Sequence, residues 1–283
     1  MPGRRAITDS ASAPDGFCHA PDATRGALDA IRPGADDMEI KAGDHGGKSR
    51  RPSRQGGQRM CTNYAPVQRQ ILRDIFGVEP PPGLFKAETY PDYLAPIVRA
   101  TDDGVRHAGL ASFGMVPRQR IPPGTRRYDT TNARSETVGE RPAFARYWRQ
   151  GQLCLVPATA FYEYAYPEDA MPGGPPGKPV RWRIWLPGEP AFGIAGLWRS
   201  WPDAALSFTM LTVNSAQHPV MERFHKPGDE KRSVVVIPRE QWDDWLACRD
   251  PEVARTFLKL FPAEAVQAEP APRITGAPIP DAE

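Results

Sequence analysis

The sequence predicts a single α+β domain with mainly antiparallel strand pairing, beginning near residue 60 and ending near residue 261. Three observations support this fold class. Hydrophobic periodicity is absent before Met60 and present after it. Most of the periodic segments are short and extended, as in strands. The helical segments do not alternate regularly with strands, as a doubly wound parallel sheet would require.

The first 59 residues are expected to form a disordered extension. Phe17 is their only aromatic residue, and Gly, Pro, Asp and Arg dominate. Such a segment buries too little apolar surface to offset the entropy that it would lose on ordering. The pattern changes after Met60, where apolar residues on one face predict a helix over residues 67–76, which Gly77 can end.

The middle of the chain is dominated by segments with strand character. They are residues 152–156, 160–164, 180–186, 192–198, 207–214 and 233–237. Helices are expected over residues 141–150, 239–247 and 251–261, because Pro142 suits a first turn and Asp250 can cap the last helix.

Two further segments are expected to lack regular structure. Residues 165–179 contain five prolines and three glycines, which favours a surface loop within the domain. Residues 262–283 are rich in proline and alanine and are expected to form a flexible tail.

Composition narrows the class of protein. The net charge of +2 gives no general electrostatic case for a polyanionic partner. No apolar run is long enough for a membrane span or a signal peptide, so we expect a cytoplasmic protein that does not bind membranes. The four cysteines are far apart, which predicts neither a disulfide framework nor a zinc site. No cofactor or metal is expected. The cysteines are Cys18, Cys61, Cys154 and Cys248.

Cys61 is the most unusual residue, because it directly follows Met60 and precedes the first predicted helix. If Met60 is the initiator, its removal would leave Cys61 with a free α-amine, of pKa about 8, beside a thiol of pKa about 8.5. An aldehyde reacts with such a pair, forming a Schiff base that the thiol closes to a thiazolidine. The competing interpretation is that Cys61 is a small buried hydrophobic residue.

Glu163 and His225 are candidates for proton transfer. Glu163 lies in the aromatic run 161–164, where burial would raise its pKa towards neutrality; alternatively it points to water from an edge strand. His225 lies in a turn-rich stretch between two predicted strands. His218 is a rival, and either histidine could simply bond to backbone.

A basic stretch runs from residue 118 to residue 150, with eight arginines against three acidic residues. Arginine suits phosphate oxygens, so this stretch, which includes Arg118 and Arg134, is a candidate surface for a nucleic-acid backbone. A solvated basic face is the alternative. Motifs of zinc peptidases, nucleotide-binding loops and serine hydrolases are absent from the sequence.

Taken together, these segments resemble the SOS response-associated peptidase (SRAP) family. The similarity covers nearly the whole expected domain and rests on several motifs in order. They are Met60-Cys61, residues 132–137, residues 154–158 leading into 161–163, residues 195–198, and His225 followed by residues 234–238.

The resemblance implies a strongly curved or barrel-like sheet with flanking helices. It also implies that Cys61, as an N-terminal residue, forms a reversible thiazolidine crosslink with abasic sites in single-stranded DNA. Asn132 would position the reacting groups, and Arg134 would hold a phosphate. Glu163 would shuttle protons, while His225 would assist Schiff-base chemistry, which can also lead to lyase activity. The family's peptidase label reflects removal of what precedes the cysteine.

Three departures from the family pattern stand out. Phe113 occupies a stretch in which many members have a tryptophan before glycine, and it is a candidate for DNA contact through stacking, whereas Arg118 is a candidate through its charge. The segment 226–232 is longer than expected. The residues ahead of Cys61 suggest that translation begins at Met60, or that the domain removes a leader.

Two other functions remain open from the sequence. One is a cysteine peptidase or amidase with an N-terminal nucleophile, and the other is a non-covalent module that binds single-stranded DNA. In each case we expect a monomer.

Overall fold

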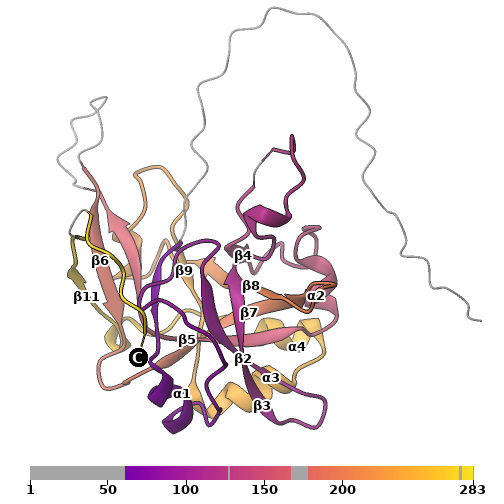
Figure 1. Ribbon diagram of the computed structural model, residues 1–283. Helices are drawn as coiled ribbons and strands as arrows, with labels where there is room; N and C mark the ends of the chain where they lie inside the picture. Colours follow the sequence, from indigo (N-terminus) through magenta and orange to yellow (C-terminus); the bar gives the residue numbers. More distant parts are fainter. Residues whose placement is uncertain (1–60, 127, 167–177, 274–275, 283) are drawn as a thin grey trace, which may run out of the picture. The chain divides into compact units, whose positions relative to one another are not determined.

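The computed structural model describes residues 61–126, 128–166, 178–273 and 276–282. Within these residues eleven strands form one curved sheet, and five of them close into a barrel (Figure 1). Around the ring, each strand pairs with the next and the last pairs with the first. The barrel strands are β2 (Leu94–Ala100), β3 (Arg106–Phe113), β8 (Leu206–Asn214), β7 (Phe192–Ser200) and β5 (Leu153–Ala165).

Strand β5 is buried on both faces along its first half. Leu153 and Leu155 pack into the apolar cluster that the helices cover, whereas Cys154 and Val156 pack into a second cluster. Because alternate residues of a strand point to opposite faces, this explains why residues 153–156 are continuously apolar. β7 runs close beside this stretch, and a Cβ on Gly196 would lie 2.9 Å from the Cys154 Sγ.

The second half of β5 leaves the barrel and pairs with β6, which in turn pairs with β11. Short strands extend the sheet elsewhere: β1 lies on β5, β4 and β9 lie on β8, and β10 lies on β7. Apart from the parallel β3–β8 and β4–β8 pairs, the described pairings are antiparallel. The additional strands are β1 (Tyr64–Pro66), β4 (Asn132–Arg134), β6 (Val180–Trp185), β9 (Arg232–Val234), β10 (Val236–Ile237) and β11 (Gln267–Pro270).

Short helices cover one apolar cluster of the sheet. Trp148, Trp242 and Trp245 are buried there, and Phe76 stacks on Trp242 with ring centres 4.4 Å apart. Asp250 caps α4, because its carboxylate accepts hydrogen bonds from the backbone amides of Glu252 and Val253. The α-helices are α1 (Arg69–Asp74), α2 (Ala145–Arg149), α3 (Trp242–Ala247) and α4 (Pro251–Thr256). The 3₁₀ segments are η1 (Arg118–Arg120), η2 (Met221–Arg223), η3 (Arg239–Gln241) and η4 (Ala263–Ala265).

The expected fold class, α+β with a barrel-like, mainly antiparallel sheet and flanking helices, is confirmed. Several element boundaries differ. The segments expected as two strands, 152–156 and 160–164, form the single strand β5. Residues 233–237 instead divide between β9 and β10. The hairpin of β2 and β3 was not predicted.

The expectation of a flexible tail from residue 262 is wrong for much of that segment. β11 pairs with β6 over residues 267–270, and Val266 is buried in the second apolar cluster. Farther along, Asp281 forms an ion pair with Lys86, with 2.8 Å between Nζ and Oδ1. The outer edge of β6 has backbone N–H and C=O groups that form hydrogen bonds with β11. Backbone pairing of this kind does not require an apolar pattern, so nothing in the sequence indicated a strand here.

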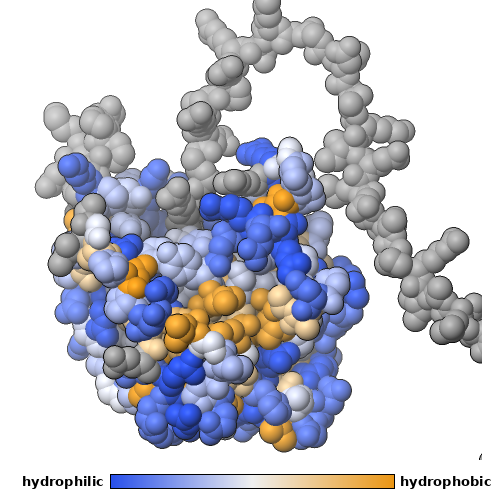
Figure 2. Space-filling model, viewed as in Figure 1, coloured by the Kyte–Doolittle hydropathy of each residue, from blue (hydrophilic) through white to orange (hydrophobic). Residues whose placement is uncertain are grey.

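Some predictions fall outside the described residues. They concern residues 1–59 and most of the loop expected at 165–179. None of the described helices is long and apolar enough to cross a membrane. Figure 2 shows apolar side chains gathered around β2 and β5 on the face in view, with polar side chains around them.

Candidate functional site

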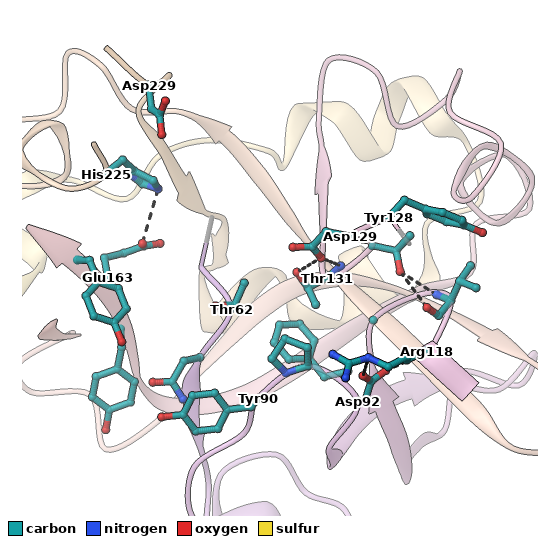
Figure 3. Close-up of a pocket in the computed structure, with 18 of the residues that line it drawn as sticks. Thr62, Tyr90, Asp92, Arg118, Tyr128, Asp129, Thr131, Glu163, His225 and Asp229 are labelled. Atoms are coloured by element: carbon teal, nitrogen blue, oxygen red, sulfur yellow. Dashed lines mark hydrogen bonds and ion pairs between the residues drawn. The ribbon is translucent and has the colours of Figure 1, made fainter. Parts of the chain in front are cut away.

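A cavity of about 1030 Å³ lies between residues 62–63 and the segment that follows β3. Thr62 and Asn63, which directly follow Cys61, contribute to its wall. Glu163 and His225 lie together at one end of the cavity, and Arg118 and Tyr128 lie at the other (Figure 3). Residues that are far apart in the sequence, including Tyr90 to Asp92, therefore meet around one cavity.

Cys61 is buried at the Glu163 end and is held by its backbone. The Asn132 Nδ2 donates a hydrogen bond of 2.7 Å to the Cys61 carbonyl oxygen. The parallel pairing of β4 with β8 puts Asn132 opposite Met210, and so sets the position of the amide. The Cys61 Sγ lies 3.7 Å from the Asn63 carbonyl oxygen and 3.8 Å from the Tyr162 carbonyl oxygen, and its single hydrogen can be donated to either.

Glu163 is buried beside the thiol, on the part of β5 that pairs with β6. Burial raises the pKa of Glu163 to about 8, while a hydrogen bond with Cys61 acts in the opposite direction. Most of the carboxyl is therefore protonated at neutral pH. The alternative of an edge-strand carboxylate pointing to water is wrong, because only 4% of Glu163 is exposed.

His225 faces Glu163, with 3.6 Å between the His225 Nε2 and the Glu163 Oε2. Burial lowers the pKa of His225, and the charge of Lys231 adds to this effect. Since the shifts of both groups favour their uncharged forms and the distance exceeds that of a hydrogen bond, we interpret the contact as a neutral carboxyl facing a neutral imidazole rather than as an ion pair.

The backbone of His225 is held in an unusual conformation. Its φ is +71°, in the left-handed region that non-glycine residues seldom adopt. The His225 amide donates to the Tyr164 carbonyl of β5 at 2.9 Å, and the Lys231 Nζ donates to the Phe224 and His225 carbonyls. The loop that follows the histidine thus fastens it against the strand that carries Glu163.

The thiol of Cys61 is uncharged in this arrangement. Burial raises its pKa well above the ordinary value, and the nearby Glu163 carboxylate raises it further. In the 283-residue chain, the Cys61 nitrogen belongs to the peptide bond with Met60, so the residue has no free amine.

Buried polar atoms without hydrogen-bond partners lie on Asn132 and Glu163, which contact Cys61, and on His225, which faces Glu163. Among the described residues these include the Asn132 Oδ1, the Glu163 Oε1 and both ring nitrogens of His225. Buried polar groups in folded proteins are nearly always satisfied, so a cluster of exceptions marks a place where a ligand can supply partners.

The three residues expected to contact DNA have different surroundings. Arg134 is part-exposed and forms an ion pair with Glu230 at 2.8 Å. Arg118 lies at the cavity wall, well exposed, with its Nε 3.4 Å from the Asp92 Oδ2. Phe113 is fully buried and stacks on Phe208, with ring centres 5.1 Å apart. Phe113 also contributes to the cavity wall, and its contact with a base stays a prediction.

His218, the rival to His225, has a structural role. Its Nδ1 accepts from the amides of Val220 and Met221, and its Nε2 lies 3.0 Å from the Phe261 carbonyl. Both ring nitrogens are therefore committed to backbone groups.

Arg181 of β6 was not predicted as part of the site. It is buried, and its guanidinium donates to the Asn63 Oδ1 at 2.8 and 3.2 Å, pairs with Glu88 and lies 3.5 Å from the Tyr162 ring centre. Asn63 is thus fixed two residues after Cys61. In the sequence, Arg181 is one cation in an amphipathic strand, and nothing in the pattern indicates that it belongs to the site.

The described residues hold no group of three or more His, Cys, Asp or Glu side chains suited to a metal ion.

A family model described as SOS response associated peptidase (SRAP) matches residues 60–276. Among curated relatives, two Bacillus subtilis proteins named abasic site processing protein, YoqW and YobE, are each 26% identical over 206 residues. These alignments cover 68% of this chain and 84% and 86% of the relatives.

Two solved structures are also similar to this chain. A Bordetella bronchiseptica protein is 31% identical, with a TM-score of 0.62, over 75% of this chain and 99% of its own. A Bacteroides thetaiotaomicron protein, 17% identical with a TM-score of 0.54, shares the fold over 74% of this chain and 90% of its own.

The raised pKa of Glu163 predicts a pH-dependent effect of Glu163→Gln on stability. Because the folded-state pKa of about 8 lies above that of the unfolded chain, this carboxyl contributes stability that is fully present below about pH 4.3 and is lost as the pH rises through 8. We expect the melting temperature of the wild type, measured relative to Glu163→Gln, to fall by at least about 3 °C between about pH 5 and about pH 9. Differential scanning calorimetry checks this, with Glu269→Gln as the exposed control. A difference that stays constant with pH contradicts it.

Proposed function

The chain belongs to the SOS response-associated peptidase family, and we propose that it captures abasic sites in single-stranded DNA as a reversible covalent adduct on Cys61. The names of the Bacillus relatives supply the substrate class. The observation that carries the proposal is the buried group of Asn132, Glu163 and His225, whose polar atoms lack partners and which meets Cys61 through Asn132 and Glu163.

The proposed reaction uses both nucleophiles of an N-terminal cysteine. The Cys61 α-amine adds to the C1′ aldehyde of the ring-opened abasic sugar, and the resulting carbinolamine loses water to give a Schiff base. The thiol sulfur then adds to the imine carbon, and the thiol proton ends on the nitrogen, which closes a thiazolidine. One water leaves, and no oxidant or reductant is needed. The reaction therefore requires that the residues ahead of Cys61 be absent from the active chain.

Asn132 would serve as a positioning residue. Its hydrogen bond to the Cys61 carbonyl fixes the backbone that carries both the nitrogen and the sulfur. A fixed pair reacts with a bound aldehyde as if it were at high effective concentration, because little orientational freedom remains to be lost.

Glu163 would move protons during ring opening and reversal. In its protonated form the carboxyl can give a proton to the sugar ring oxygen, and as a carboxylate it can accept one from the C1′ hydroxyl. A pKa near the working pH suits both directions. A free α-ammonium on Cys61 would lower the pKa of Glu163 and of the thiol, because a nearby positive charge favours their anionic forms.

His225 would act beside Glu163. Its lowered pKa leaves an imidazole that can take a proton from the attacking amine or from the carbinolamine. Its unpartnered ring nitrogens leave it able to bond to substrate. Strand cleavage by β-elimination would compete at the Schiff-base stage, and ring closure by sulfur would suppress it by removing the imine.

The start of the active chain is part of the proposal. Initiation at Met60 followed by methionine removal would expose Cys61, and so would removal of a leader by the domain itself. The peptidase label of the family fits either route, since both end with the release of what precedes the cysteine.

A chain beginning at Cys61 should form a covalent adduct with single-stranded DNA bearing one abasic site. We expect a shifted band after boiling in detergent, and no such band for Cys61→Ala or for the full 283-residue chain left unprocessed, which lacks the free amine. Binding without any covalent species would instead indicate a non-covalent DNA-binding module. Cleavage of an added peptide in the absence of DNA would indicate a peptidase.

Substitution of Glu163 should separate chemistry from binding. In Glu163→Gln we expect adduct formation and reversal to slow by about 10²-fold, which is typical for loss of a general acid–base group. Anisotropy on an intact oligonucleotide should change little, and this serves as the control. A wild-type time course in Glu163→Gln would remove the residue from the mechanism.

A further inference from the structure

A cluster of arginines and aromatic rings adjoins the end of the cavity farthest from Glu163. We call it the arginine–aromatic strip. It consists of Arg120 of η1, Arg146 and Tyr147 of α2, Arg199 of β7, and Trp201 in the turn that follows β7. None of these residues takes part in the chemistry proposed for Cys61.

The rings of the strip hold two of its guanidinium groups, those of Arg199 and Arg120, in place. The Arg199 guanidinium carbon lies 3.6 Å from the Trp201 ring centre and 4.9 Å from that of Tyr147. The Arg120 guanidinium carbon lies 4.9 Å from the Trp201 ring centre. The Trp201 Nε1 donates to the Ser207 Oγ at 3.0 Å, which fixes the ring itself. Cation–π contacts of this kind pre-order a planar fork of donors.

The positive charge of the strip is only partly compensated. Arg120 pairs with Asp203, but within the described part of the chain neither Arg146 nor Arg199 forms an ion pair with a carboxylate. The Arg199 Nε is buried without a hydrogen-bond partner. Burial lowers the pKa of Arg199, and the charges of Arg146 and Arg120 contribute to the lowering, against Tyr147 and Tyr128. An anion placed there would relieve this repulsion.

The strip continues from the cavity. Tyr128 lines the cavity and is close enough to Arg199 to raise the pKa of its guanidinium, against the larger lowering by burial. Arg118 and Ile121, on either side of Arg120 in the chain, also line the cavity. Since Arg118 and Tyr128 lie at the end opposite Glu163 and His225 (Figure 3), a strand leaving the cavity at that end meets the strip.

We propose that the arginine–aromatic strip binds phosphates of the single strand that flanks the abasic nucleotide, on one side of the lesion. The inference rests on the proposed function and deepens it, because it assigns a contact beyond the reacting nucleotide. The contacts are to the backbone, so they do not depend on base sequence. They also predict a salt-dependent contribution of about 0.7 to the slope of log K against log salt for each phosphate bound.

The test uses a chain beginning at Cys61 and oligonucleotides with one abasic site. One flank at a time is shortened from about ten nucleotides to about two, a length at which few phosphates remain to be bound. Affinity is measured by anisotropy over a range of salt concentrations, and adduct formation is measured on gels. For the wild type we expect one shortened flank to weaken binding by about tenfold or more and the other to matter less.

Arg199→Gln and Arg146→Gln should each abolish this dependence on the flank and reduce the salt slope by about 0.7. Arg183→Gln is the matched control, because Arg183 also stacks on a tryptophan, Trp185, at 4.6 Å, but on β6. It should retain the wild-type behaviour. Asp203→Asn, an exposed substitution, should instead tighten binding at low salt by about two- to fivefold, since it removes the carboxylate that competes for Arg120.

Unchanged flank dependence and salt slope in both arginine variants would overturn the inference, and so would an unchanged affinity in Asp203→Asn. The absence of any adduct in the wild type would count against the proposed function instead. Non-covalent binding measured by anisotropy still tests the strip in that case, so the two failures are distinguishable.

Discussion

The hydrogen bond from the Asn132 amide to the Cys61 carbonyl joins two distant parts of the chain, and the arrangement of the site depends on it. Asn132 is placed by the parallel pairing of β4 with β8, whereas Cys61 enters the sheet through β1, which lies on β5. β5 also carries Glu163, and its Tyr164 carbonyl holds the amide of His225. The barrel thus acts as a rigid frame on which four separate segments place one polar group each.

The burial of this polar group has an energetic cost. A carboxyl with a pKa of about 8 and a histidine of lowered pKa are both kept from their preferred charged states, and the Cys61 thiol is kept neutral as well. A purely structural core would replace them with apolar side chains. Their retention beside a cavity is understandable if each atom left without a partner serves a bound substrate. The left-handed backbone of His225 is a further local strain at the same place.

The sequence was informative where a residue contradicts its surroundings. Glu163 within an aromatic run and Cys61 directly after a methionine are both visible without a structure. Phe113 could not be judged, because whether a ring faces a base or the core depends on the strand pairing of β3. Arg181 had no signal, since its role comes from contact with Asn63 across the sheet. β1 and β4 are three residues long, and β11 pairs through its backbone, so hydrophobic patterns could not reveal them.

The central claim is that Cys61 reacts through its amine and its thiol together. Intact-mass spectrometry of the adduct, with and without iodoacetamide under denaturing conditions, tests it most directly. For a chain beginning at Cys61, the account predicts a mass equal to protein plus oligonucleotide minus one water. It also predicts alkylation of Cys154 and Cys248 but not of Cys61, whose sulfur is locked in the ring. An adduct in which Cys61 is alkylated as well would contradict the account.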